Sequence, residues 1–143
     1  MVEIKKHNDR DSDPLTRGII KACYRVRSEL GPGFGEKVYL NALKIALGLL
    51  NLGYEVEKEF RVSFQKQNVG KFLVDLVIEN SVIVELKAVE GRIPKIFESQ
   101  VISYLKASGL NVGLLVNFGN QRCEVRRLMT SRLSKPNRCY QMR

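Results

Sequence analysis

The chain of 143 residues has the length of a single domain, and its 44% of hydrophobic residues can bury a substantial core. It has no run of about 18 apolar residues, and its first residues, MVEIKKHNDRDSDP, lack the apolar core of a signal peptide, which predicts a cytoplasmic location without a membrane span. The formal net charge is +9, and residues 121–143 hold seven Lys and Arg against the single acid Glu124, a net +6. This excess indicates either a polyanionic partner or a solubilising basic tail.

The cysteines and the histidine exclude two classes of site. Cys23, Cys123 and Cys139 are odd in number and widely spaced, which fits neither a disulfide framework nor a metal-binding pair, so free thiols are expected. The only histidine is His7. A zinc site built from Cys and His, and catalysis by a serine or cysteine paired with a histidine, are therefore excluded.

Two helices are predicted first. Asp13-Pro14 has the chemistry of a helix start, an N-cap followed by a proline in the first turn. An apolar stripe at three- and four-residue spacing continues from there, formed by Leu15, Ile19, Cys23, Val26 and Leu30. The segment LGPGFG, residues 30–35, ends this helix, and a second helix is expected over residues 35–51 with Gly53 as its stop.

The centre of the chain predicts strands. Apolar and polar residues alternate over 54–64, and the two apolar runs within residues 71–90 flank a turn at Glu79-Asn80-Ser81, which predicts a β-hairpin. A helix over 95–107, with Gly109 as its stop, and a strand over 111–118 follow, with CEVRRL, residues 123–128, as a candidate last strand. The order ααβββαβ predicts an α/β fold with a mixed, mainly antiparallel sheet flanked by helices.

The hairpin carries an unusual set of charges. If its turn centres on Asn80, Asp75 lies directly opposite Glu85, and two carboxylates then repel each other on one face. A divalent cation such as Mg²⁺ would remove the conflict, because it binds carboxylate oxygens and keeps positions open for water and phosphate. Lys87 projects from the same face. These groups have the parts needed for metal-assisted phosphodiester hydrolysis.

A purely structural explanation stays open for these charges. Glu-x-Lys is also common as an ion pair on exposed strands. The flanking SVIV, residues 81–84, and the apolar partner strand indicate a central strand instead, where an unpaired charge costs several kcal/mol and often marks function.

Several ordered motifs together resemble one family. They are Gly33-x-x-Glu36-x-x-Tyr39, the Asp75 strand, VIVELKAVE, and ESQVISYLKASGLNVGLLVNFG, and they run from about Leu15 to Gly119. This set resembles the GxxExxY proteins, a group within the PD-(D/E)XK nuclease superfamily. The resemblance implies a restriction-endonuclease-like fold and a nuclease that depends on Mg²⁺ or Mn²⁺.

The resemblance also implies roles for the charged residues of the hairpin. Asp75 and Glu85 would be metal ligands together with the main-chain carbonyl of Leu86, and Lys87 would be the catalytic lysine. Glu36 would be an additional metal-binding acid, although by itself it is an ordinary first-turn glutamate favoured by the helix dipole.

Gln100 and Tyr104 share a helix face, which by itself is a polar edge beside a core stripe. The spacing Gln-x-x-x-Tyr is similar to a motif of recombination-type exonucleases, which implies contact with substrate phosphates or with the lysine. Tyr39 is expected to pack in the core, with its hydroxyl directed to the site.

The chain departs from the family pattern in three places. Val74 stands where the superfamily's name has proline, and Phe97 stands where many family members have a histidine. A histidine-assisted contact to metal or phosphate is therefore not expected. The basic segment after Gly119 is longer than the family core.

The resulting prediction has three segments, a loose N-terminal segment (1–12), a nuclease-like domain (13–129) and a basic C-terminal tail (130–143). The partner is expected to be nucleic acid, DNA rather than RNA, with Arg126, Arg127 and Arg132 contacting its backbone. A non-catalytic nucleic-acid-binding module, an RNA-processing nuclease and a structural ion cluster stay open as alternatives, as does a homodimer.

Overall fold

The computed structural model describes residues 2–6, 13–130 and 140–142. Its elements, in chain order, are β1 Val2–Lys6, α1 Pro14–Leu30, α2 Glu36–Leu49, β2 Tyr54–Phe64, β3 Gln67–Ile78, β4 Val82–Lys87, α3 Lys95–Ser108, β5 Val112–Asn117, β6 Glu124–Thr130 and β7 Tyr140–Met142. The predicted order ααβββαβ and the candidate strand at CEVRRL are confirmed. Strands β1 and β7 are additional, and they lie in the two terminal segments expected to be loose.

The strands form one sheet in the order β1-β6-β5-β4-β3-β2-β7. Among the described strands, only β4 and β5 are parallel, and the remaining pairs are antiparallel, as predicted for a mixed, mainly antiparallel sheet. Strand β4 lies in the middle, and residues 82–86 are buried because helices cover both faces of the sheet. The Glu-x-Lys sequence therefore lies on a central strand.

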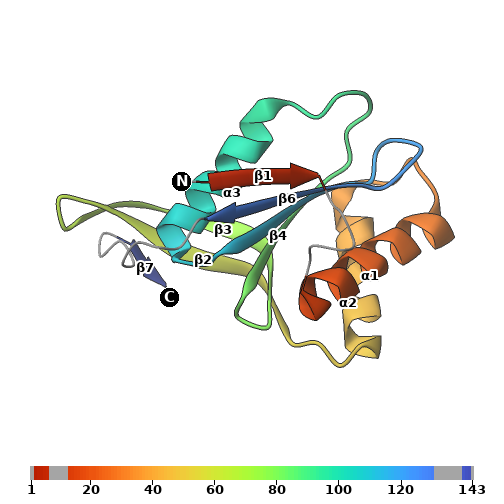
Figure 1. Ribbon diagram of the computed structural model, residues 1–143, viewed down its shortest axis with the longest axis horizontal. Helices are drawn as coiled ribbons and strands as arrows, with labels where there is room; N and C mark the ends of the chain where they lie inside the picture. Colours follow the sequence, from red (N-terminus) through yellow and green to blue (C-terminus); the bar gives the residue numbers. More distant parts are fainter. Residues whose placement is uncertain (1, 7–12, 131–139, 143) are drawn as a thin grey trace.

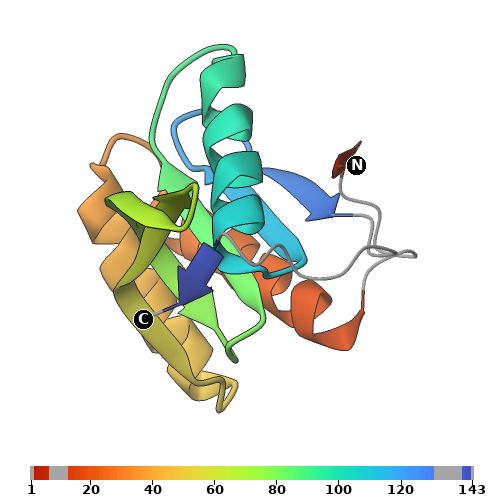
Figure 2. The same cartoon turned by 90° about the vertical axis from the view of Figure 1, so that its left-hand side faces the viewer.

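The helices divide between the two faces (Figures 1 and 2). Helices α1 and α2 pack on one face, where Ile19, Leu43 and Leu47 join Val84 and Leu86 in one apolar cluster. Helix α3 packs on the opposite face, where a second cluster forms around buried residues that include Val101, Leu105, Ile83 and Leu115. Alternate residues of β4 thus enter opposite clusters, as the two-residue period of a strand requires.

The predicted ends of α1 and α3 are confirmed by their capping residues, whereas α2 ends at Leu49 with Leu50 as its C-cap, so the prediction of Gly53 as its stop is wrong. Asp13 caps α1, because its carboxylate accepts hydrogen bonds from the Thr16 main-chain N–H at 2.8 Å and from the Thr16 hydroxyl at 3.0 Å. Gly109 ends α3 in the left-handed conformation with φ 74°. No helix in the described part of the chain is long and apolar enough to span a membrane.

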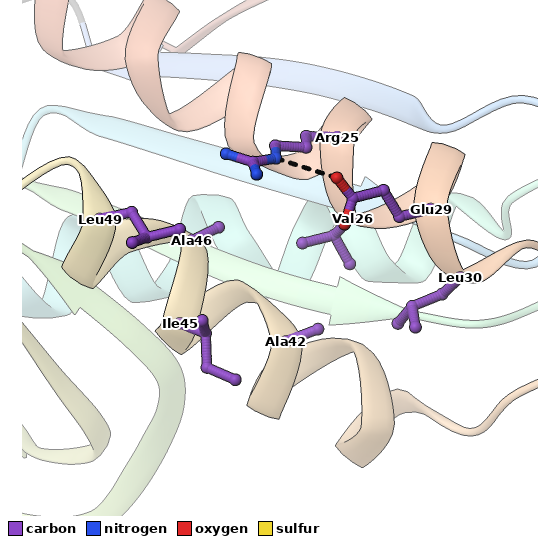
Figure 3. Close-up of a pocket in the computed structure, with 8 residues that line it drawn as sticks. All are labelled: Arg25, Val26, Glu29, Leu30, Ala42, Ile45, Ala46 and Leu49. Atoms are coloured by element: carbon purple, nitrogen blue, oxygen red, sulfur yellow. Dashed lines mark hydrogen bonds and ion pairs between the residues drawn. The ribbon is translucent and has the colours of Figure 1, made fainter.

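An apolar groove lies between α1 and α2 on the outer side of this helical layer (Figure 3). Its volume is about 160 Å³, and its walls come from Val26 and Leu30 of α1 and from Ala42, Ile45 and Leu49 of α2. None of the charged residues of the β3–β4 hairpin lines it. The groove is therefore a surface feature separate from the site described next.

Candidate active site

Strands β3 and β4 separate at the charged residues. The last regular pair of the ladder is Leu76 opposite Val84, and this register places Asp75 opposite Glu85, as predicted. From this point, hydrogen bonds from side-chain carboxylates take the place of the main-chain hydrogen bonds between the two strands. The Asp75 N–H donates to Glu85 Oε1 at 2.9 Å, and the Leu86 N–H donates to Asp75 Oδ2 at 2.8 Å. Each carboxylate is thus held across the opening by the main chain of the other strand.

The negative charges of Asp75 and Glu85 repel each other. The pKa of Glu85 is raised to about 7, first by burial and then by the negative charge of Asp75. The pKa of Asp75 is also raised, again mainly by burial, although the hydrogen bond from Leu86 and the charge of Lys87 oppose this. Glu85 is only 6% exposed, so water does little to screen the repulsion.

Lys87 lies at the end of β4 beside these acids. Its ammonium lies 4.3 Å from the centre of the Phe97 ring. Phe97 is the residue that stands where the family pattern often has a histidine. A cation over an aromatic face is attracted by the ring quadrupole. Phe97 therefore positions the lysine from α3, while the main-chain carbonyl of Lys87 accepts a hydrogen bond from Phe118 N–H at 2.8 Å.

Tyr104 approaches the acids from α3. The Tyr104 ring stacks on Phe72 with centroids 4.5 Å apart, and its pKa is raised by burial and by the charges of Glu85 and Asp75. The hydroxyl thus stays protonated and can donate a hydrogen bond. Gln100 lies one turn before Tyr104 on the same helix and is half-buried.

Glu36 begins α2 and is exposed, yet its charge contributes to the raised pKa of Glu85. No group of three or more His, Cys, Asp or Glu side chains placed to hold a metal ion occurs among the described residues. Tyr39 packs in the core as expected, stacked on Phe118 at 4.5 Å, while its hydroxyl donates to the Gly31 carbonyl at 2.7 Å. That hydroxyl therefore stabilises the loop before α2, and the expectation that it is directed to the site is wrong.

Two asparagines that were not predicted as functional residues form hydrogen bonds with the main chain after Lys87. The Asn117 side-chain amide accepts from Val89 N–H and donates to Val89 C=O, both at 2.9 Å. Asn120 does the same with Gly91, at 2.7 and 2.8 Å. Asn117 is fully buried. The sequence signal that could have found it is an amide near the end of an apolar predicted strand, because a buried polar side chain needs hydrogen-bond partners.

The arginines expected to contact phosphate are already engaged within the protein. Arg126 forms an ion pair with Glu98. Arg127 is buried, 6% exposed, and its guanidinium lies 3.8 Å from the carboxylate of Asp13. Arg132 lies outside the described residues. A phosphate contact by these three residues stays a prediction.

The donor set fits a hard divalent cation. Asp75 and Glu85 each have one oxygen held by a main-chain N–H. Within the described residues, no hydrogen bond engages Asp75 Oδ1 or Glu85 Oε2, and oxygen ligands of this kind suit Mg²⁺ and Mn²⁺. A bound cation would also offset the repulsion that raises both pKa values.

This fold and this pair of strand-borne acids with a lysine define a class of protein. The sequence profile of the PD-(D/E)XK nuclease superfamily matches residues 13–128. The chain belongs to this superfamily, and its substrates are accordingly nucleic acids. No curated protein and no solved structure shows significant similarity to it.

Proposed function

We propose that the protein is a metal-dependent nuclease that hydrolyses phosphodiester bonds in DNA, and that it belongs to the GxxExxY group of its superfamily. One observation carries this proposal. Asp75 and Glu85 face each other in the opening between β3 and β4, with Lys87 two residues further along the same strand. The Gly33-x-x-Glu36-x-x-Tyr39 sequence supports the narrower assignment.

Asp75, Glu85 and the main-chain carbonyl of Leu86 would hold a Mg²⁺ or Mn²⁺ ion, and Glu36 would add a further carboxylate from α2. Bound there, the ion would polarise the scissile phosphate and lower the pKa of a water molecule. Glu36 is exposed at the first turn of its helix, so its side chain is free of core packing and can reorient toward the acids.

Side chains of the protein would then orient the attacking water and stabilise the charge that develops on the phosphate. The Lys87 ammonium would position the attacking water and offset the negative charge that develops on the phosphorus. The protonated Tyr104 hydroxyl and the Gln100 amide would donate hydrogen bonds to phosphate oxygens. The stacking of Tyr104 on Phe72 and of Lys87 on Phe97 sets both groups before substrate arrives.

The proposal is tested by nuclease assays on single- and double-stranded DNA and RNA with Mg²⁺, with Mn²⁺ and with chelator. Wild type is compared with Lys87→Ala and Asp75→Ala, and each change is expected to lower kcat at least 100-fold, since each removes a group that acts at the reacting phosphate. Lys106→Ala is the matched control, because Lys106 is exposed at the far end of α3.

Cleavage that survives both changes would refute the assignment. Binding of DNA without cleavage under any condition would favour a non-catalytic binding module, and cleavage of RNA alone would favour an RNA-processing nuclease. Each chain holds one set of these residues, so cutting both strands of a duplex at one position would require a second copy. Sedimentation with and without DNA tests that expectation.

A further inference from the structure

Strands β2 and β3 continue beyond the candidate active site as a ribbon. Strand β7 pairs with its base at Phe60, Arg61 and Val62, and beyond Val62 the ribbon is two-stranded among the described residues. Strand β3 leaves its pairing with β4 at Asp75 but stays paired with β2 as far as the turn at Gln65-Lys66. At about 3.3 Å per residue, the run from Asp75 to Gln67 spans roughly 25 Å. We call residues 60–72 the arm. Figure 1 shows it reaching away from α1 and α2.

The direction of the arm ties it to the site. Because β3 runs antiparallel to β4, the arm continues past the end of β4 that carries Glu85 and Lys87. A series of three stacked aromatic rings fixes its base, of which Phe60 is fully buried and the other two are partly buried. Phe60 stacks on Phe72 with centroids 5.3 Å apart, and Phe72 stacks on Tyr104 of α3. A long substrate placed at Asp75 would therefore run alongside the arm.

The charges of the arm suit a polyanion. It holds Arg61, Lys66 and Lys71 and contains no Asp or Glu. Arg61 lies directly opposite Lys71 in the antiparallel register, and like charges so placed destabilise a sheet. Lys71 also forms an ion pair at 3.0 Å with Glu59 just outside the arm, yet its side chain is 68% exposed. A phosphate beside this pair would offset the repulsion.

The end of the arm adds exposed apolar side chains. Phe64 and Val69 are 66% and 61% exposed, on opposite strands next to the turn. Apolar side chains at the tip of a protruding basic ribbon are suited to contact base edges or to wedge between base steps. The arm thus combines backbone-binding charge with groups that reach into a groove.

We propose that the arm binds a groove of double-stranded DNA beside the scissile phosphate. This inference rests on the proposed function, which it extends to the form of the substrate. A two-stranded ribbon fits the major groove of B-form DNA, about 12 Å wide, whereas the major groove of an RNA duplex is too narrow to admit it.

A competing explanation is that the lysines of the arm protect the protein from self-association. Lysines on exposed strands also prevent edge-to-edge pairing between copies of a protein. The two explanations predict different losses. If the lysines only protect, replacing them increases self-association and leaves DNA affinity unchanged.

The test measures binding by the full chain without cleavage. Lys87→Ala serves as the background, and Lys66→Gln/Lys71→Gln is compared with Lys21→Gln/Lys106→Gln, which removes the same charge from exposed positions on α1 and α3. The probes are a 30-base-pair DNA duplex, its single strands and an RNA duplex. Thermal unfolding checks that every variant is folded.

For the arm variant, we expect about tenfold weaker binding to the DNA duplex, and a plot of log affinity against log salt that is shallower by about 2. The control is expected to match the background within twofold, and Phe64→Ala is expected to weaken duplex binding more than single-strand binding.

Equal affinity for the arm variant and the control would overturn this inference while leaving the nuclease assignment in place. Preference for single strands or for the RNA duplex would also overturn it. If the background protein binds none of the nucleic acids, the proposed function fails and this inference fails with it.

Discussion

Glu85 couples a proton equilibrium of the candidate site to the stability of the fold. Its pKa lies near 7 in the folded protein against 4.5 for a free glutamate, chiefly because it is buried and secondly because Asp75 is charged. A carboxyl group whose pKa is higher in the folded than in the unfolded state binds its proton more tightly when folded. Its deprotonation therefore destabilises the fold as the pH rises from about 4.5 through about 7.

We expect the free energy of unfolding of the metal-free protein to fall between pH 5 and pH 8 by on the order of 3 kcal/mol, and Glu85→Gln to remove most of this dependence. Urea unfolding at closely spaced pH values, with chelator present, measures it. Glu29→Gln, an exposed glutamate on α1, is the control. A pH dependence equal in wild type and Glu85→Gln would show that another group causes it.

At the scale of elements, the loop after β4 is held by its neighbour rather than by its own sequence. The Asn117 and Asn120 amides bind the main chain of Val89 and Gly91, and Arg27 of α1 donates to the carbonyls of Phe118 and Asn120. Side-chain amides thus continue the pairing of β4 and β5 beyond their last parallel pair, at Lys87 and Asn117. These hydrogen bonds fix the course of the main chain just after Lys87, and therefore the position of Lys87 at the end of β4.

Gly119 allows this contact because it has no side chain. A Cβ atom there would lie 2.3 Å from the Val89 main-chain oxygen, which cannot move without breaking the Asn117 bonds. We expect Gly119→Ala to destabilise the protein by about 1–3 kcal/mol. We also expect it to lower kcat by roughly 10- to 100-fold through displacement of the β4 end. Unfolding and nuclease assays measure the two effects.

Gly18→Ala is the matched control for this change. Gly18 lies within α1 and a Cβ atom there meets nothing within 4 Å, so alanine should stabilise the helix by up to about 1 kcal/mol and leave kcat unchanged. A neutral effect of Gly119→Ala on both readouts would contradict the role assigned to the loop.

At the scale of the whole molecule, Asp75 and Glu85 lie in the middle of the sheet. Helices pack on both faces of β4, and β3 and β5 pair with it. An ion bound between β3 and β4 would therefore stabilise the fold and not only a surface loop. This coupling provides a test that needs no substrate.

We expect Mg²⁺ or Mn²⁺ to raise the midpoint of thermal unfolding at pH 8, because a ligand at 100 times its Kd adds roughly 3 kcal/mol to the stability of the state that binds it. Differential scanning calorimetry with and without the ion measures the shift. Asp75→Ala should abolish it, whereas Glu29→Gln should not. A shift of equal size in Asp75→Ala would place the ion elsewhere.

Local sequence determined the elements and the register of the site. Apolar periodicity and capping residues such as Asp13 and Gly109 predicted the helices, because these signals act within a few residues. The turn centred on Asn80 placed Asp75 opposite Glu85, since a hairpin of fixed turn position has one register. The division into a domain over residues 13–129 with two terminal segments stays a prediction.

Tertiary structure decided what depends on residues distant in the chain. The two edge strands have only five and three residues, too few for a pattern that predicts a strand on its own, and they take their structure from pairing with β6 and β2. Three features depend on contacts between separate elements: the ion pairs of Arg126 and Arg127 with acids, the amide contacts after Lys87, and the separation of β3 from β4 at Asp75. Burial and pairing across the sheet set these features, and a local pattern of residues does not record them.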